Sequence, residues 1–432
     1  MDPLRGTFPE TAVNRSLAPN FAIALTLAAL APMGADAKSM MRGQRLTAPE
    51  AYATSFAQTT PAVSGDWIAV FGRLSDAAGD GRVYVFHRQA GNWSLYQELA
   101  PPDGTAGQDV VAFAGNTLIV GSPNAWDAQA SASTGAVSLY TLQNSQWTFS
   151  QAIHSYTGFM GTGTGFGSSL AVDGPMLFVG FPGYVNAGGL QVGDVEAYYL
   201  SSFPAAYVGQ IVPKDPVVSS NFGSSVAAAK GLLAVGADNL GLAGVGESAG
   251  AIYTFSKSIN GWAQAAILTA PTANAYDYFP GALVFDGSRI VAGDGNFQSN
   301  VKGGPYGTAV SYMYSSGAFS LETELSNDAE FGNMFGTSIT SNKGLSLVGA
   351  VFAGSAGEVN AYQHVNGEWQ SAGILGTEGL QDGDGFGVSM ATDGTTLAVG
   401  SIEAFRSPAS AGALYVFSYP PTDRLFSDGL DD

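Results

Sequence analysis

The chain repeats one pattern of apolar and polar positions, in which two short apolar runs flank a polar turn that contains Gly. The stretch 222–236, FGSSVAAAKGLLAVG, shows it most clearly. Four further copies keep the same step of fourteen residues between the opening Phe and the closing Gly, at 166–180, 279–293, 335–349 and 386–400. Apolar runs joined by a two- or three-residue turn with Gly predict β-hairpins. Five copies at one spacing therefore predict a repeat protein.

The closing Gly also occurs in two earlier units that lack the Phe-Gly opening, so the units number seven. These glycines are 49 to 59 residues apart: Gly72, Gly121, Gly180, Gly236, Gly293, Gly349 and Gly400. After each closing Gly comes a second Gly with an aromatic residue five positions later, which predicts a third strand that is apolar on both faces. A fourth strand is indicated by an aromatic residue with an aliphatic one six positions later, as in Trp93 and Leu99. The third unit is irregular around 203–211.

Seven units of four strands predict an all-β fold, a seven-bladed β-propeller of four-stranded antiparallel blades. The seventh unit has no fourth strand before the C-terminal tail. At the other end of the chain, 45–49 (RLTAP) is similar to 267–271 (ILTAP), which ends a fourth strand. We therefore expect an N-terminal strand to complete the last blade and remove an open sheet edge. A disordered leader is the alternative.

The first 37 residues resemble an export signal. Arg5 and Arg15 precede an apolar stretch at 21–30, and Ala35-Asp36-Ala37 places small residues where an export peptidase cleaves. The alternative is an ordinary disordered N-terminus. The expected organisation is a signal peptide at 1–37, the propeller at 38–420 and an acidic tail at 421–432. We expect an exported protein, secreted, periplasmic or on the cell surface, with no transmembrane segment.

Charge and cysteine content narrow the classes of partner. Without residues 1–37 the chain keeps 14 basic and 32 acidic side chains, a formal charge of −18. Such a field repels phosphate backbones and anionic lipid, so we expect no nucleic acid partner. The chain has no Cys. Disulfides, thiolate nucleophiles and thiolate metal sites are therefore excluded.

The unit that runs from FGSSVA through LAVG to GAIYTF resembles the FG-GAP repeat of bacterial exported proteins and, more distantly, the α-subunit propeller of integrins. The resemblance covers about 44–419 and implies an extracellular adhesion or recognition platform. Integrin repeats carry a calcium loop inside the hairpin, but turns of two or three residues are too short for the six to eight oxygen ligands of calcium. No cofactor is predicted, and a calcium site in another, longer loop remains the alternative. The tail resembles a short ending seen on exported bacterial proteins.

Other residues of types found in catalytic or metal sites are expected to have structural or surface roles. Gly246-Glu247-Ser248-Ala249-Gly250 fits the G-x-S-x-G nucleophile elbow, but Ser-Ala-Gly recurs before other third strands, so no catalytic residue is assigned. We expect His87, His154 and His364 to be surface residues in different blades without a partner. The acids Asp382 and Asp384, and Asp76 with Asp80, are expected to be solvated loop residues.

Link lengths predict the binding face. The links between second and third strands run 8 to 14 residues, and they open on the same end as the blade-to-blade links. Because function usually resides on loops held by a rigid scaffold, this end is the expected binding surface. Its predicted residues are Trp126, Asp127, Phe181, Tyr184, Asn239, Phe297 and Phe405. We expect a monomeric, non-catalytic recognition or adhesion protein for a protein or glycan. The alternatives are a propeller enzyme acting on glycans and a structural envelope protein.

Overall fold

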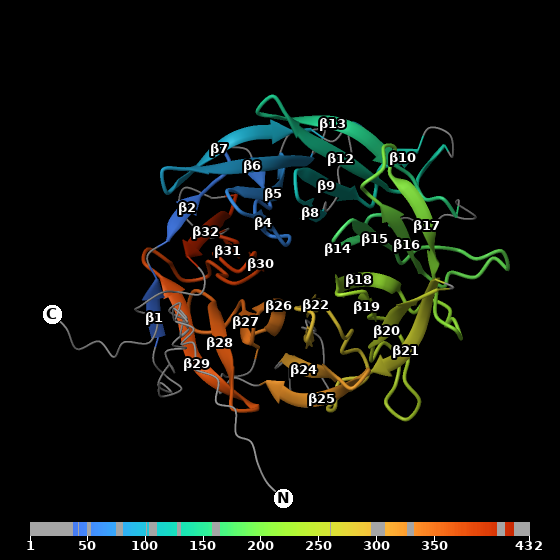
Figure 1. Ribbon diagram of the computed structural model, residues 1–432. Helices are drawn as coiled ribbons and strands as arrows, with labels where there is room; N and C mark the ends of the chain where they lie inside the picture. The colour runs from blue at the N-terminus through green and yellow to red at the C-terminus, as the bar shows by residue number, and fades with distance from the viewer. Residues whose placement is uncertain are drawn as a thin grey trace, which may run out of the picture. The chain divides into compact units, whose positions relative to one another are not determined.

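The computed structural model describes residues 38–41, 43–49, 53–74, 81–100, 102, 110–127, 131–157, 165–259, 261–294, 307–325, 332–403 and 411–418. The described residues are all-β and form seven blades arranged in a ring around a central axis (Figure 1). The predicted export segment at 1–37 and the predicted tail at 421–432 lie outside them. Within the described ranges, no helix is long and apolar enough to span a lipid bilayer.

The first three blades each contain four antiparallel strands, listed from the axis outward. Blade 1 has β4 (Ala62–Ser64), β5 (Trp67–Leu74), β6 (Gly81–Gln89) and β7 (Asn92–Leu99), with β3 (Ala53–Thr54) added to β5. Blade 2 has β8 (Val110–Ala114), β9 (Thr117–Ser122), β12 (Ala136–Gln143) and β13 (Gln146–Ile153), and a separate hairpin of β10 (Trp126–Asp127) and β11 (Ala132–Ser133). Blade 3 has β14 (Ser169–Asp173), β15 (Met176–Phe181), β16 (Asp194–Tyr199) and β17 (Ala206–Ile211), so the irregular third unit does form its fourth strand.

The other four blades follow the same order. Blade 4 has β18 (Phe222–Ala229), β19 (Leu232–Ala237), β20 (Ala251–Ser258) and β21 (Gly261–Leu268). Blade 5 has β22 (Ala282–Phe285), β23 (Arg289–Asp294), β24 (Thr308–Ser315) and β25 (Ala318–Leu325). Blade 6 has β26 (Phe335–Asn342), β27 (Leu345–Ala350), β28 (Glu358–Val365) and β29 (Glu368–Thr377), with β1 (Lys38–Met41) added in parallel to β29. Blade 7 has β30 (Met390–Thr392), β31 (Thr396–Ser401), β32 (Ala413–Ser418) and β2 (Gln44–Leu46).

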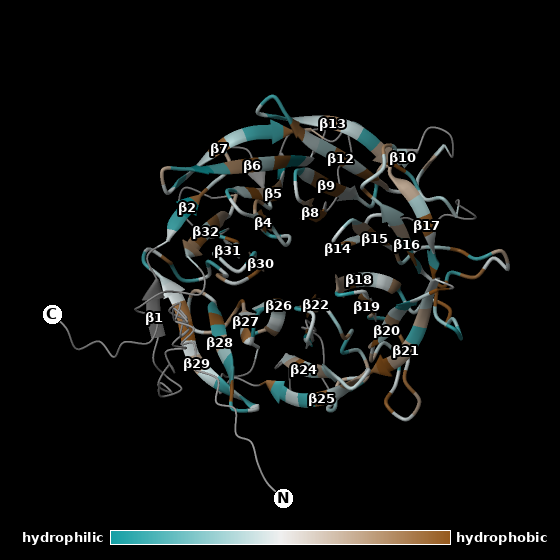
Figure 2. Cartoon of the chain, in the orientation of Figure 1, coloured by the Kyte–Doolittle hydropathy of each residue, from teal (hydrophilic) through white to brown (hydrophobic). Residues whose placement is uncertain are grey.

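The hydropathy pattern follows the position of each strand in its blade. Second strands lie between neighbouring blades, and β15 and β19 are buried at every position. Outermost strands have one face toward solvent, so β21 alternates between exposed and half-buried residues. The composition of the outermost strands varies around the ring: β25 carries Glu322 and Glu324, whereas β21 contains no charged residue and ends in a brown arrowhead in Figure 2.

The signature residues of the repeat lie where adjacent blades meet. A Cβ atom on Gly180 would be 2.1 Å from the carbonyl oxygen of Gly223 in the next blade, and one on Gly293 would be 2.1 Å from that of Gly336. No side chain fits in so short a distance, so the closing Gly is required for close packing of the blades. The opening Phe of the following blade is fully buried on the same seam, as Phe222 illustrates.

A serine in the opening segment also links neighbouring blades. Ser169, Ser338 and Ser389 donate hydrogen bonds to the carbonyl oxygens of Gly223, Gly387 and Ala57 at 2.8, 2.5 and 2.7 Å. Ser225 holds the same position in blade 4, but its buried Oγ has no hydrogen-bond partner among the described residues. There the ring of Pro280 lies beside Gly236, where five other seams have a backbone carbonyl of the next blade.

Blade 1 has an opening residue that the sequence pattern did not reveal. Phe56 is fully buried against Tyr84 and Phe86, and a Cβ atom on Gly412 of blade 7 would be 2.3 Å from its carbonyl oxygen. Ala57 follows it with a φ of 59°, in the left-handed region that glycine occupies at this position in blades 3, 4, 6 and 7. Blade 1 therefore lacks the Phe-Gly pair, as predicted, but it does have an opening Phe, followed by Ala in place of Gly. Phe56 lies sixteen residues before Gly72 instead of fourteen, which hid the correspondence.

The N-terminal strand closes the ring, as predicted. β2 pairs antiparallel with β32, and Arg45 on β2 forms a two-pronged ion pair with Glu403, whose side chain is fully buried. The side chain of Gln44 exchanges two hydrogen bonds with the backbone of Trp93 in blade 1, at 2.5 and 2.7 Å. Gln97 of blade 1 holds Trp147 of blade 2 in the same way. β2 thus makes the contacts of a regular fourth strand.

Candidate functional site

The two ends of the propeller differ in the length of their connections. At one end, which we call the tight-turn end, first and second strands are joined by two or three residues. In blades 1 to 6 third and fourth strands are joined by two residues, except for the six residues 200–205 of blade 3, and in blade 7 the fourth strand comes from the N-terminal part of the chain. The opposite, loop-bearing end carries the second-to-third-strand links and the blade-to-blade links. Some of its described links contain pairing of their own, such as the β10–β11 hairpin and the bridge between Leu242 and Gly246.

The residues predicted for the binding surface have different surroundings. Trp126 lies on the β10–β11 hairpin and is 53% exposed. Phe181 is buried, so the prediction that Phe181 belongs to an exposed surface was wrong. Tyr184 is half-buried against Phe181, and its carbonyl oxygen accepts hydrogen bonds from two amides of its own link. Asn239 accepts a hydrogen bond of 2.6 Å from Ser248 Oγ. Asp127 lies in β10 but its side chain is not described, and Phe297 and Phe405 lie outside the described residues.

Several exposed aromatic residues of the loop-bearing end were missed by the sequence prediction. Tyr156 and the pair Tyr276 and Tyr278 lie on blade-to-blade links, and Phe352 lies on the second-to-third-strand link of blade 6; they are 70%, 46%, 41% and 51% exposed. Three of them, Tyr156, Tyr276 and Tyr278, could have been predicted from the sequence, because they are aromatic residues in long blade-to-blade links. The tight-turn end also exposes apolar residues, but these come from blades 3 and 4: Tyr199, Phe203 and Ile259.

Charge is distributed unequally between the two ends. In the described parts of blades 4 to 6, every Lys and Arg belongs to the tight-turn end: Lys230, Lys257, Arg289 and Lys343. The link between blades 3 and 4 carries Lys214. The loop-bearing end of blades 4 to 6 presents the exposed carboxylate of Glu247 and the half-buried one of Asp238. Among the described residues of these blades this end is therefore the more negative, which favours a cationic or hydroxyl-rich ligand over an anionic one.

A buried pair of acids supports the loop-bearing end between blades 2 and 3. Glu196 is fully buried and accepts hydrogen bonds from Ser155 Oγ (2.6 Å), the amides of Tyr156 (3.0 Å) and Thr157 (3.1 Å), and Thr157 Oγ1 (2.7 Å). It therefore fixes the start of the blade 2–3 link. Asp194, also fully buried, accepts from Gln210 through Oδ2. Its Oδ1 has no hydrogen-bond partner in the described part of the chain. Burial, and next the charge of Glu196, raise the pKa of Asp194 well above its usual value.

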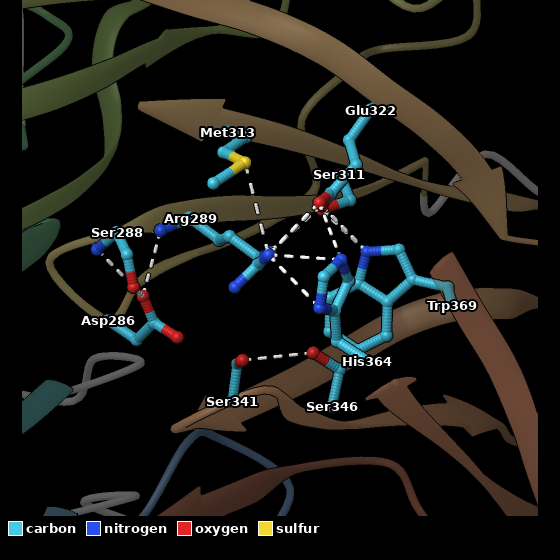
Figure 3. Close-up of polar contacts among 10 residues, drawn as sticks. All are labelled: Asp286, Ser288, Arg289, Ser311, Met313, Glu322, Ser341, Ser346, His364 and Trp369. Carbon is cyan, nitrogen blue, oxygen red and sulfur yellow. Dashed lines mark hydrogen bonds and ion pairs between the residues drawn. The ribbon is translucent and has the colours of Figure 1, made fainter. Parts of the chain in front are cut away.

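A polar cluster joins blades 5 and 6 at the tight-turn end (Figure 3). Arg289 Nε lies 2.9 Å from Glu322 Oε2, and His364 Nε2 lies 2.9 Å from Glu322 Oε1. Trp369 Nε1 and Ser311 Oγ both donate to Glu322 Oε2, at 2.8 Å each. The side chains of Arg289, Glu322 and His364 are only 11 to 15% exposed. His364 was predicted to be a surface residue without a partner. This prediction was wrong, because Glu322 of the adjacent blade 5 pairs with it.

The corresponding seam between blades 1 and 2 has an aromatic composition. The equivalent positions hold Trp67, Tyr96, Leu142 and Trp147, which pack in one apolar cluster with Trp67 edge-on to both Tyr96 and Trp147. The two seams occupy the same place in the repeat. We therefore interpret the polar cluster as structural: it holds blades 5 and 6 together, as the aromatic cluster holds blades 1 and 2 together.

Two further predictions concern individual motifs. Ser248 of the G-x-S-x-G sequence donates its Oγ hydrogen to Asn239 Oδ1 instead of to a histidine, and it precedes a third strand, as expected for the repeat. Asp384 is buried and accepts the amide of Gln381 at 2.6 Å, so its assignment as a solvated acid was wrong. Asp382 is exposed, as predicted. Asp76 and Asp80 lie outside the described residues.

Acids near the hairpin turns and the central axis have backbone partners. Asp173 accepts the amide of Gly231 at 2.7 Å, and Asp393 accepts that of Gly65 at 2.8 Å, so each caps a neighbouring blade. Across the seven described innermost strands, Asp173 is the sole carboxylate. No group of three or more His, Asp or Glu residues in the described ranges is placed to hold a metal ion.

The fold and its two unequal ends define the class of protein: an all-β, seven-bladed β-propeller closed by its N-terminal strand. No model of a known protein family matches the chain, and no curated protein matches it.

Proposed function

We propose that this chain is an exported, non-catalytic recognition or adhesion propeller of the FG-GAP type, which binds an extracellular protein or glycan through its loop-bearing end. The observation that carries the proposal is the set of exposed aromatic side chains in the described parts of that end's links, from Trp126 in blade 2 to Phe352 in blade 6. Exposed aromatic residues bind both protein partners and sugar rings with large contact area at a small cost in conformational entropy.

A rigid scaffold supports this surface. The second-to-third-strand links start on strands that are buried between blades, such as β15 and β19, and Glu196 and Asn239 hold the bases of two links by hydrogen bonds. A ligand that meets such a surface orders few side chains on binding, which favours affinity.

The test is an array of glycans and extracellular proteins probed with the full chain and two variants. Trp126→Ala removes an exposed aromatic side chain from the loop-bearing end, and Ile259→Ala removes a fully exposed apolar one from the tight-turn end. For a ligand that contacts blade 2, we expect the first variant to weaken binding about tenfold or more and the second to leave it unchanged. A ligand that survives all loop-end substitutions but is lost with Ile259→Ala contradicts the proposal.

Export is tested separately. Expression of the full chain in a bacterial host followed by N-terminal sequencing of the exported product should give Lys38 as the first residue. Retention of the intact N-terminus inside the cell contradicts this part of the proposal without affecting the binding face.

A further inference from the structure

Tyr276 and Tyr278 stand on a backbone platform built from two blades. The segment that carries them runs beside the second-to-third-strand link of blade 4, with the amide of Tyr276 donating to Glu247 O (2.8 Å) and that of Tyr278 to Ser248 O (2.9 Å). Asp277, between the two tyrosines, is 4% exposed and accepts the amide of Asn274. The intervening residue thus anchors the segment, while both phenol rings remain accessible to solvent.

The backbone at both tyrosines is in a conformation that large side chains rarely adopt. Their φ angles are 66° and 53°, in the left-handed region. For residues other than Gly this region is unfavourable, because Cβ approaches the following carbonyl oxygen. The surrounding hydrogen bonds hold the backbone of the two tyrosines in this conformation, so the platform is formed before any ligand arrives.

A carboxylate completes the surface. The hydroxyl of Tyr276 donates to Glu247 Oε2 at 3.2 Å, and both side chains are exposed. In the described parts of blades 4 to 6, no Lys or Arg belongs to this end, and the whole chain carries a formal charge of −19. Electron-rich rings beside an exposed carboxylate in a negative field match a cationic group, which gains from both cation–π attraction and charge. A neutral sugar would gain only the stacking.

We propose that Glu247, Tyr276 and Tyr278 form a binding site for an arginine or lysine side chain of a protein partner. The proposal rests on the recognition function above and specifies the chemistry of its ligand. The partner's cation lies against the phenol rings and pairs with the free oxygen of Glu247. Because an exposed ion pair is weak alone, the rings supply the affinity and the carboxylate supplies the preference for positive charge.

The test uses three probes on the full chain, by calorimetry at low salt: a Gly-Ser peptide with two arginines, the same peptide with citrulline in their place, and chitotriose. Citrulline keeps the shape of arginine but removes its charge. We expect the arginine peptide to bind at least five times more tightly than the citrulline peptide, and to weaken severalfold when salt is raised to about 0.3 M. Equal binding of the two peptides, or binding of chitotriose alone, overturns the proposal.

Matched variants locate the site. Glu247→Gln should abolish the preference for arginine over citrulline, and the double change Tyr276→Ala and Tyr278→Ala should weaken the arginine peptide at least tenfold. Glu368→Gln removes an equally exposed charge from the tight-turn end of blade 6 and should change affinity less than twofold. Unchanged binding in the double variant, with an unaltered melting temperature, overturns the proposal. If the array identifies a ligand that needs Trp126 while the arginine peptide fails to bind, this inference fails and the proposed function stands.

Discussion

The two ends of the propeller use polar residues differently. At the tight-turn end of blades 5 and 6, Arg289, Glu322 and His364 are nearly buried and bonded to one another. At the loop-bearing end of blades 4 and 5, Glu247 and Tyr276 bond to each other and remain exposed. Polar groups engaged inside a seam stabilise the ring, whereas polar groups on an ordered, exposed platform are available to a ligand. The following predictions test that difference, from the largest expected effect to the smallest.

Removing the charge of Glu322 should have the largest effect on stability. Glu322→Gln leaves the Arg289 guanidinium nearly buried without its counter-charge, and we expect a loss of about 2–4 kcal/mol in the free energy of unfolding. Glu247→Gln, which removes an exposed carboxylate at the other end, should leave the free energy of unfolding close to that of the wild type. Urea unfolding of both variants measures the difference. Equal losses would mean that the two ends do not differ in this way.

Acid should weaken the same seam. Burial by itself raises the pKa of Glu322, but hydrogen bonds from Arg289, Ser311 and Trp369 and the charge of Arg289 bring it below its ordinary value of 4.5. Since the pKa is lower in the folded state, the carboxylate stabilises the fold above pH 4.5, and this contribution is lost as the pH falls through the folded-state pKa. The free energy of unfolding, measured at intervals between pH 7 and 3, should fall more steeply for the wild type than for Glu322→Gln. Parallel curves would contradict the assignment.

Asp194 should show the opposite pH dependence. Its pKa is raised in the folded state, so its contribution to stability declines as the pH rises from the ordinary value of 3.8 toward the folded-state pKa. Asp194→Asn removes this ionisation, and we expect the variant to gain about 1 kcal/mol over the wild type at neutral pH. The gain should shrink at pH 4. A variant that is less stable at pH 7 would indicate that the ionised carboxylate has a partner.

The smallest effect concerns the serine links between blades. Ser338→Ala removes a buried hydrogen bond to Gly387 O and should cost about 1 kcal/mol. Ser225→Ala removes the same atom from a position where Oγ has no partner in the described structure, so it should be neutral or slightly stabilising. Thermal unfolding of the two variants measures the difference in stability. An equal loss of stability in both would show that Ser225 Oγ makes a hydrogen bond.

Most of the fold could be predicted from the sequence because its signature residues meet local steric demands. Gly180 and Gly293 cannot carry a side chain against the next blade, so the pattern repeats with every seam. The ring closure was predictable as well, because β2 repeats the composition of other fourth strands. Phe56 escaped prediction because two additional residues separate it from its closing Gly.

The candidate site was less predictable because exposure depends on packing between distant segments. Trp126 and Phe181 both follow the closing Gly of their repeats, yet Trp126 is exposed on a link, whereas Phe181 ends β15 and fills the seam beside Phe166. His364 gains its partner from Glu322, 42 residues earlier in the chain, through the packing of two blades. Tyr276 and Tyr278 were visible in the sequence, but their orientation depends on Asp277 being anchored between them.

Hydroxyl-radical footprinting of the full chain, with and without the first ligand that the array identifies, tests the central claim most directly. We expect protection of side chains on the loop-bearing links, among them Trp126, Tyr276, Tyr278 or Phe352, and unchanged reactivity of Phe203 and Ile259 at the tight-turn end. Protection of Phe203 and Ile259 with unchanged reactivity on the loop-bearing links would place the binding face at the opposite end of the propeller.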